Sequence, residues 1–156
     1  MRAHTLVWHS QTPSWFFTKN YDGSKVVTPA VMDARLDFYI HNVMGHVMDK
    51  EKALTGSAGS IVYAWDVVNE YLHRPSFAFF KTWTSVYGDM GNSPSYVKKA
   101  FEIAYDMLKN YQATDKVTLF YNDYNTYFGV KDTLNLVEFI NKCETAKICG
   151  GILTLL

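Results

Sequence analysis

Apolar positions along the chain form two kinds of pattern in turn. Short and nearly continuous apolar runs predict four strands, at residues 3–8, 61–68, 117–121 and 148–153. Between these runs, apolar side chains recur every three or four residues, which predicts three helices, at residues 29–52, 94–108 and 133–142. Alternation of strand and helix is typical of an α/β protein with a parallel sheet and helices packed outside it.

Two of the predicted helices carry a clear start signal. Thr28-Pro29 and Ser93-Pro94 each place a capping side chain before a proline, which is tolerated in the first helical turn. The residues expected to face inward are, in chain order, Leu36, Ile40, Val43, Met44, Val47, Val97, Ala100, Phe101, Ala104, Leu108, Leu134, Val137 and Ile140. The stretch from Tyr71 to Tyr87 is rich in aromatic residues and is expected to be a connection.

Composition narrows the class of partner. The chain has 156 residues, 48% of them hydrophobic, which suits one domain with its own core. Fifteen basic and fifteen acidic residues give a formal net charge of zero, and no basic run suggests nucleic acid or a membrane surface. No run approaches the ~20 apolar residues of a membrane span. Aromatic residues are 16% of the chain and often adjoin polar residues, a combination that suits neutral sugars.

The sequence predicts neither a metal site nor a cofactor. Cys143 and Cys149 form no CxxC motif and have no nearby histidine, so we interpret them as free thiols rather than a disulfide or a ligand pair. His4 and His9 are separated by an odd number of positions on a predicted strand, which places them on opposite faces.

Polar side chains gather where three of the predicted strands end. The three segments are Trp8 to Gln11, Asn69-Glu70 and Asn122 to Asn125. Active sites of parallel sheets and barrels are built at the carboxyl ends of the strands. We therefore expect one cleft lined by amides, aromatic rings, a histidine and carboxylates.

Glu70 is the candidate general acid of that cleft. It ends the segment "WDVVNE" at residues 65–70, directly after an apolar strand, where an unpartnered polar group costs about 2–7 kcal/mol. Glycoside cleavage needs a carboxylic acid that protonates the leaving oxygen, and apolar surroundings favour the protonated form. Asn69 is placed to hydrogen-bond a sugar hydroxyl. The alternative for Glu70 is a solvated carboxylate at the start of a loop.

Three segments closely resemble one enzyme family. They are "RAHTLVWHSQTPSWF" at residues 2–16, "WDVVNE" at 65–70 and "LFYNDYN" at 119–125. In this order they resemble glycoside hydrolase family 10, the retaining endo-1,4-β-xylanases with a (β/α)₈ TIM barrel. The resemblance extends to about Gly151. It implies that residues 1–156 form a partial catalytic domain, with about four consecutive βα units that match the third to sixth strands of the family.

The resemblance also assigns roles to single positions. It implies that Glu70 is the acid/base, that Asn69 holds the 2-hydroxyl of the sugar at the cleavage point, and that His4 and Trp8 wall the same subsite. Further positions implied to contact substrate are Gln11 at the next sugar on the non-reducing side, and Asn122 and Tyr124 on the leaving-group side. We interpret Asp66 and Asp123 as structural. For Trp15, Trp83 and Tyr87, stacking on sugar and local packing remain equal alternatives.

Parts of the family pattern are missing from this sequence. The strands before the matched region, with an Asn, Glu and Lys set, have no counterpart, and a Gln and a His expected soon after Gly151 do not appear. The nucleophilic glutamate is expected in a missing C-terminal segment. We therefore expect xylan hydrolysis from the family, but little or no turnover from these 156 residues alone.

Other readings of the chain stay open. It could be a non-catalytic xylan-binding module or an inactive truncated fragment. A half barrel has two unpaired edges, so self-association of a chain that does not fold alone is a third alternative. The expected partner is xylan or xylo-oligosaccharide, with no nucleic acid and no membrane. Because the polymer cannot enter a cell, we expect a secreted, extracellular protein, although the N-terminus has no signal peptide.

Overall fold

The computed structural model describes residues 1–74, 81–142 and 154–155. The strands are β1 (Arg2–Trp8), β2 (Ala64–Asn69), β3 (Thr118–Asp123) and β4 (Thr154–Leu155). The helices are α1 (Pro29–Thr55), α2 (Trp83–Tyr87), α3 (Ser95–Asn110) and α4 (Val130–Asn141), and the short 3₁₀ turns are η1 (Ser14–Phe17), η2 (Lys19–Tyr21) and η3 (Thr126–Gly129).

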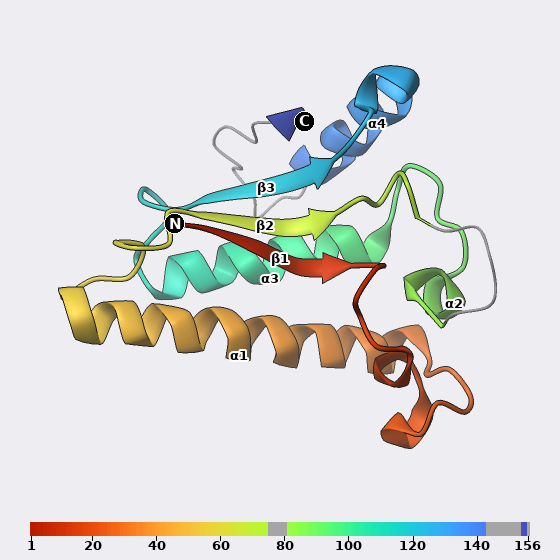
Figure 1. The fold of residues 1–156 in the computed structure, drawn as a ribbon, viewed down its shortest axis with the longest axis horizontal. Coiled ribbons are helices and arrows are strands. Elements are labelled where there is room, and N and C mark those ends of the chain that lie inside the picture. Colours follow the sequence, from red (N-terminus) through yellow and green to blue (C-terminus); the bar gives the residue numbers. More distant parts are fainter. Residues whose placement is uncertain (75–80, 143–153, 156) are drawn as a thin grey trace.

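The strands form one parallel sheet in the order of the sequence, β1-β2-β3-β4 (Figure 1). This confirms the parallel α/β arrangement that the alternating pattern predicts. The fourth strand was expected at residues 148–153, which lie outside the described residues, as do both cysteines. The described strand β4 begins directly after that range and pairs with the end of β3.

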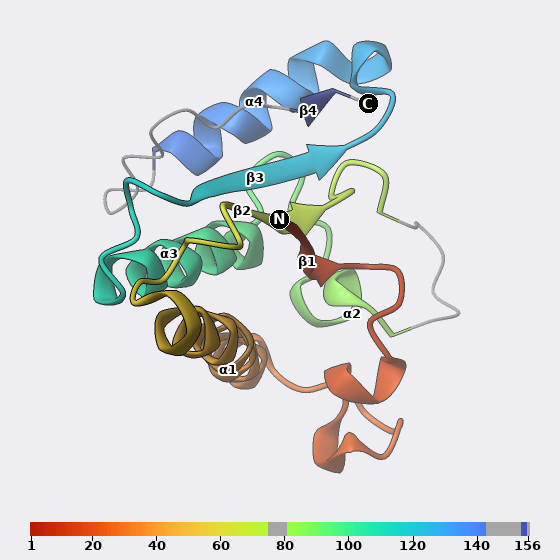
Figure 2. The same ribbon diagram turned by 60° about the vertical axis from the view of Figure 1, so that its left-hand side comes forward.

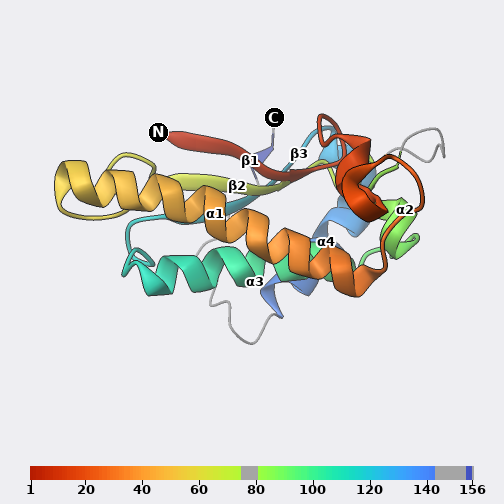
Figure 3. The same ribbon diagram turned by 90° about the horizontal axis from the view of Figure 1, so that it is seen from below.

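The long helices lie together on one side of the sheet. Figures 1 and 3 show α1 and α3 side by side beneath β1 and β2, running back against the strand direction. Figure 2 shows the helices following the curve of the sheet, and none of the described helices covers its other side. On that other side the Arg2 guanidinium lies 4.4 Å from the ring centre of Phe120.

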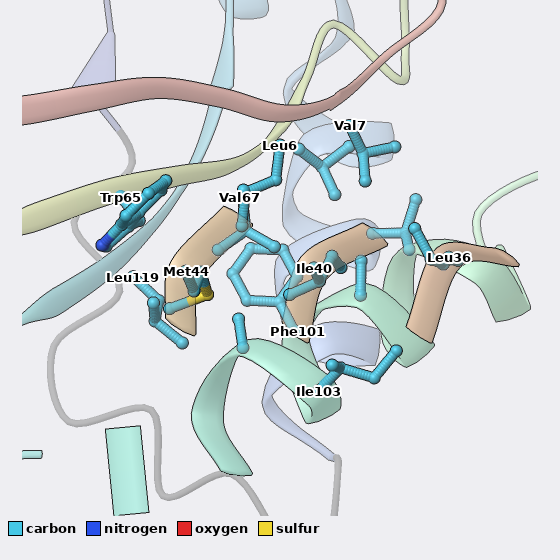
Figure 4. Packing of buried hydrophobic residues seen from close by; sticks show 14 of the residues in the cluster. Leu6, Val7, Leu36, Ile40, Met44, Trp65, Val67, Phe101, Ile103 and Leu119 are labelled. Carbon is cyan, nitrogen blue, oxygen red and sulfur yellow. The ribbon is translucent and has the colours of Figure 1, made fainter. Parts of the chain in front are cut away.

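The core fills the space between this sheet and its helices. On α1, buried side chains recur every fourth residue, at Met32, Leu36, Ile40, Met44 and Met48. Figure 4 shows Val67 of β2 pointing toward α1 and toward Phe101 of α3. All five inward residues predicted for α3 are buried. The predicted strands and helices therefore meet as an α/β core.

Two expectations about local structure were wrong or incomplete. Leu134 was expected to face inward, but it is 62% exposed, while Leu136 is fully buried. The stretch expected to be a connection contains the short helix α2, and its Trp83 is buried with its ring stacked 4.9 Å from Tyr96. For Trp83 the structure therefore decides in favour of packing.

A buried carboxylate fixes the passage from α1 to β2. Glu51, in the last turns of α1, is 4% exposed. Its carboxylate accepts the backbone N–H groups of Gly59 at 2.6 Å, of Ile61 at 3.1 Å and of Val62. Because these donors precede β2, Glu51 links the position of the helix to the start of the strand.

Candidate active site

Three polar or aromatic residues from neighbouring strands stand in one row. Trp8 of β1 pairs with Asn69 of β2, and Asn69 pairs with Asn122 of β3. Partners on adjacent strands lie about 4.8 Å apart, so the row crosses the carboxyl end of the sheet as a continuous line. We call Trp8, Asn69 and Asn122 the polar row.

Irregularities in the pairing of the strands determine which residues stand opposite each other in the polar row. The pairing shifts by one residue between His4 and Val7 in β1, and again between Asp66 and Val68 in β2. Counted from Asp66 without the extra residue, Asn69 would stand opposite Asp123 instead of Asn122. Bulges that re-aim side chains are common beside active sites.

Glu70 stands next to the polar row in an uncommon backbone conformation. Its φ of 55° is in the left-handed region, which few residues other than glycine adopt. Its backbone N–H donates to the carbonyl oxygen of Asn122 at 2.8 Å, which ties the residue to β3. Its side chain, 23% exposed, accepts a hydrogen bond from the indole N–H of Trp8 at 2.7 Å. Glu70 is therefore held from both neighbouring strands, through its backbone from β3 and through its carboxylate from β1, while part of the side chain remains accessible.

The two amides of the polar row are oriented by each other. The Nδ2 of Asn122 donates to the Oδ1 of Asn69 at 2.6 Å. This uses the acceptor of the Asn69 amide and leaves its N–H donors for another partner. The Oδ1 of Asn122 is buried and has no hydrogen-bond partner among the described residues. Both amides thus keep unused hydrogen-bonding capacity beside Glu70.

Asp66 orients His4 on the open side of the sheet. The Asp66 side chain is buried and contacts the Arg2 guanidinium at 2.5 Å and the Nδ1 of His4 at 2.8 Å. The His4 ring meets the Trp8 ring edge-on, with 5.9 Å between centres. The structure therefore places Asp66 as a support and His4 as the outer neighbour of Trp8.

Asp123 supports the opposite side of the site. It is 2% exposed and accepts hydrogen bonds from the Tyr121 hydroxyl and from the Leu72 backbone N–H at 3.2 Å. Its other oxygen contacts the Nδ1 of His73 at 2.6 Å, and the His73 ring stacks on Tyr124 with centres 3.9 Å apart. The Tyr124 ring, 42% exposed, is thereby held in place beyond Asn122.

The remaining predicted residues are less closely connected. Gln11 is exposed with a φ of 63°, and no hydrogen bond joins its side chain to the described site. Trp83 acts indirectly, because its indole N–H donates to the Trp8 carbonyl at 3.0 Å. His73 was not predicted at all, since it belongs to none of the quoted motifs and meets Asp123 only through the fold.

His9 is the second ionisable group beside Glu70. Its Nε2 lies 3.8 Å from Glu70 Oε2, and its Nδ1 is buried without a partner among the described residues. Burial lowers the pKa of His9 below its ordinary value of 6.5, and the nearby Glu70 carboxylate opposes this shift only in part. His9 is therefore favoured in its neutral form.

We expect His9 to make the fold less stable in acid. Because its pKa is lowered in the folded chain, the unfolded chain takes up a proton first as the pH falls below 6.5, and stability decreases through this range. In His9→Gln, the part of this acid-induced loss of stability that comes from His9 should be absent. Urea unfolding at pH 7.5 and pH 5 measures the difference, and an identical pH dependence in variant and parent would contradict the assignment. His46→Gln, at an exposed position of α1, is the matched control.

Among the carboxylates on or directly after the described strands β2 and β3, only that of Glu70 is partly accessible and has no cationic partner. Asp66 and Asp123 are both buried and bound to cationic or histidine partners, so neither is available as the nucleophile of a retaining mechanism.

No group of three or more potential ligand residues is placed to hold a metal ion in the part of the chain that the structure describes. None of the helices described is long and apolar enough to cross a membrane.

Comparison with known proteins accounts for this arrangement. The model of glycosyl hydrolase family 10 matches residues 1–152. The chain belongs to this family. Endo-1,4-beta-xylanase A of Butyrivibrio fibrisolvens is 48% identical over 153 residues, which are 97% of this chain and 34% of that protein. Endo-1,4-beta-xylanase A of Thermotoga neapolitana is 40% identical over 146 residues, 91% of this chain and 12% of that protein.

Solved structures of family 10 members match as well. An intracellular xylanase of Thermoanaerobacterium saccharolyticum, in complex with xylotriose, matches with a TM-score of 0.65 and 31% identity, over 92% of this chain and 40% of that one. A xylanase of Clostridium thermocellum in complex with xylohexaose gives 0.62 and 33%, over 87% and 26%. The chain thus spans between 12% and 40% of the length of these matched relatives and forms part of a (β/α)₈ barrel.

Proposed function

We propose that this family 10 chain carries the acid/base half of an endo-1,4-β-xylanase site. The observation that supports this most is the placement of Glu70, held by the Trp8 indole and tied to Asn122, beside a row of amides with unused hydrogen-bonding capacity. The proposed substrate is xylan or a xylo-oligosaccharide, cut at internal β-1,4 bonds with retention of configuration.

In the proposed reaction Glu70 gives its proton to the glycosidic oxygen as the bond breaks. The Trp8 N–H then stabilises the carboxylate that remains, because hydrogen bonds to a charged acceptor are stronger than those to a neutral one. The free N–H of Asn69 faces the sugar 2-hydroxyl. The nucleophile is a carboxylate about 5–5.5 Å from Glu70, and it comes from a part of the barrel other than these residues.

The test is a chimera. The matching segment of the Butyrivibrio fibrisolvens xylanase A, 48% identical over 153 residues, is replaced by this chain. We expect the chimera to release reducing sugar from soluble xylan and to lower its viscosity early, as internal cleavage does. The parent enzyme and the isolated chain are run alongside, and the isolated chain should show little or no release. A folded chimera without activity would contradict the proposal.

We also propose that the protein acts outside the cell, because polymeric xylan does not cross a membrane. One matched structure is that of an intracellular xylanase. Short xylo-oligosaccharides inside the cell are therefore the competing substrate. Fractionation of the native host distinguishes the extracellular from the intracellular location, when the protein is detected by its activity or by an antibody in the medium and in the cytoplasm.

A further inference from the structure

The carbonyl oxygen of Trp8 is held by two side chains that lie outside the sheet. The Thr12 hydroxyl donates to it at 2.6 Å, and the indole N–H of Trp83 donates to it at 3.0 Å. Trp8 is also the residue whose own indole N–H donates to Glu70 at 2.7 Å. Two hydrogen bonds therefore connect Trp83 to the candidate acid, with Trp8 between them.

Trp83 comes from a different part of the fold than Trp8. It is the first residue of α2, 75 positions later in the sequence, and Figures 1 and 2 show α2 beside the carboxyl end of β1. The backbone N–H of Thr82 donates to the Ser85 hydroxyl at 3.0 Å, which closes the first turn of α2. The place of the indole is therefore set by α2 and its contacts, and not by β1.

The ring of Trp83 is packed in two directions. Tyr96 of α3 stacks on it, with ring centres 4.9 Å apart and an angle of 11° between the planes. Phe17 of η1 lies at 84° to it, with centres 5.2 Å apart. All three side chains are buried. A ring packed in this way has little freedom to turn, so its N–H stays directed at the Trp8 carbonyl.

The same stack reaches both long helices. The Tyr87 ring stacks on Tyr96 with centres 5.3 Å apart, and the Tyr87 hydroxyl donates to Asp33 of α1 at 2.6 Å. Tyr96 itself belongs to α3. The position of Trp83 is therefore fixed by α1 and α3, which also hold the sheet.

Packing alone does not account for the hydrogen bond from Trp83 to Trp8. Trp65 of β2 is also buried, 5% exposed, and its indole N–H has no partner among the described residues. The core of this chain thus holds a buried indole that only packs. The indole of Trp83 is instead directed at a residue of β1 that itself contacts Glu70.

We propose that Trp83 is a positioning residue for the acid/base, because it holds the Trp8 backbone so that the Trp8 indole N–H stays on the Glu70 carboxylate. This inference rests on the proposed function and extends it to a residue that does not itself contact substrate. Glu70 gives its proton to the leaving sugar oxygen, and the Trp8 N–H stabilises the carboxylate that results. A displaced Trp8 removes that stabilisation and slows the step that depends on the proton.

The first experiment uses Trp83→Phe, which keeps an aromatic ring in the stack and removes the N–H donor. In the chimera it should lower the rate of xylan hydrolysis at substrate saturation about tenfold, the order of one hydrogen bond, with KM nearly unchanged. An aryl xyloside with a strongly acidic phenol needs no proton and should keep most of its first-step rate. Trp65→Phe is the matched control, because it makes the same change at a buried indole without a described partner, and it should affect both substrates alike.

The second experiment needs neither sugar nor chimera. NMR follows the rate at which the Trp8 indole hydrogen exchanges with solvent in the chain itself, and Trp8→Phe assigns the signal. Trp83→Phe should speed this exchange about tenfold, because the bond from Trp8 to Glu70 opens more often, and Trp65→Phe should not. Thr12→Val removes the other donor to the Trp8 carbonyl and leaves the stack in place, so it should act in the same direction and replaces Trp83→Phe if that variant does not fold.

The two experiments separate this inference from the proposed function. Equal losses on both substrates, or unchanged Trp8 exchange in Trp83→Phe and Thr12→Val, would overturn the positioning role and leave the function standing. Faster exchange together with a folded chimera that hydrolyses no xylan would overturn the proposed function and the positioning role with it, while the link from Trp83 to Glu70 would stand. A loss confined to xylan, together with faster exchange, supports both.

Discussion

Replacing Glu70 by alanine in the chimera should reduce xylan hydrolysis by about 10²–10⁴-fold, the usual contribution of a general acid or base. Of the carboxylates of Asp66, Glu70 and Asp123, which the described residues place on or directly after β2 and β3, only that of Glu70 is neither buried nor bound to a cation. Xylan has a poor leaving group, since a sugar hydroxyl leaves only when it is protonated. The measurement is the initial rate of reducing-sugar release at substrate saturation.

The same variant can be tested with a substrate that does not need the acid. An aryl xyloside with a strongly acidic phenol as its leaving group should keep most of its first-step rate in Glu70→Ala, because the phenolate leaves without a proton. Equal losses on both substrates would indicate a damaged fold and contradict the acid role. Glu138→Ala, an exposed glutamate on α4, is the control and should leave both rates unchanged.

The second large effect concerns stability. Glu51→Ala should lower the free energy of unfolding by about 3–5 kcal/mol, because three backbone N–H groups before β2 lose their acceptor and two of these bonds are buried. Urea denaturation followed by circular dichroism measures the change. Glu51→Gln keeps one acceptor oxygen of the same shape and should lose less. A loss of less than about 1 kcal/mol in Glu51→Ala would show that the carboxylate is not the tie between α1 and β2.

Much of the fold followed from periodicity in the sequence. Strands β1 to β3 and helices α1, α3 and α4 lie close to where the apolar spacing places them, because a face that packs against a core must repeat with the geometry of its element. Polar residues at three strand ends predicted one site, because parallel strands bring their carboxyl ends to one edge. In the structure, one residue from each of these three strand ends, Trp8, Asn69 and Asn122, lies in the polar row.

Other features depend on contacts that spacing does not specify. Leu134 fits a three-residue spacing with Val137, whereas Leu136 lies four residues before Ile140, and only packing selects the buried leucine. His73 is positioned by its contact with Asp123, which lies fifty residues later in the chain. No local sequence pattern predicts such a contact. The roles assigned to His4 and Gln11 came from the family resemblance and stay predictions, and of these two only His4 contacts the polar row in the structure.

The bulge in β2 affects the proposed site without being needed for the fold itself. If β2 and β3 paired without the extra residue between Asp66 and Val68, the sheet and its helices could still form, but Asp123 would stand where Asn122 now faces Asn69. Such a molecule would give a normal circular dichroism spectrum but would lack the polar row on which the proposed sugar binding depends. Under the proposed function, the quality of a preparation is therefore measured by the fraction of chains that titrate with oligosaccharide, and not by the fraction that is folded.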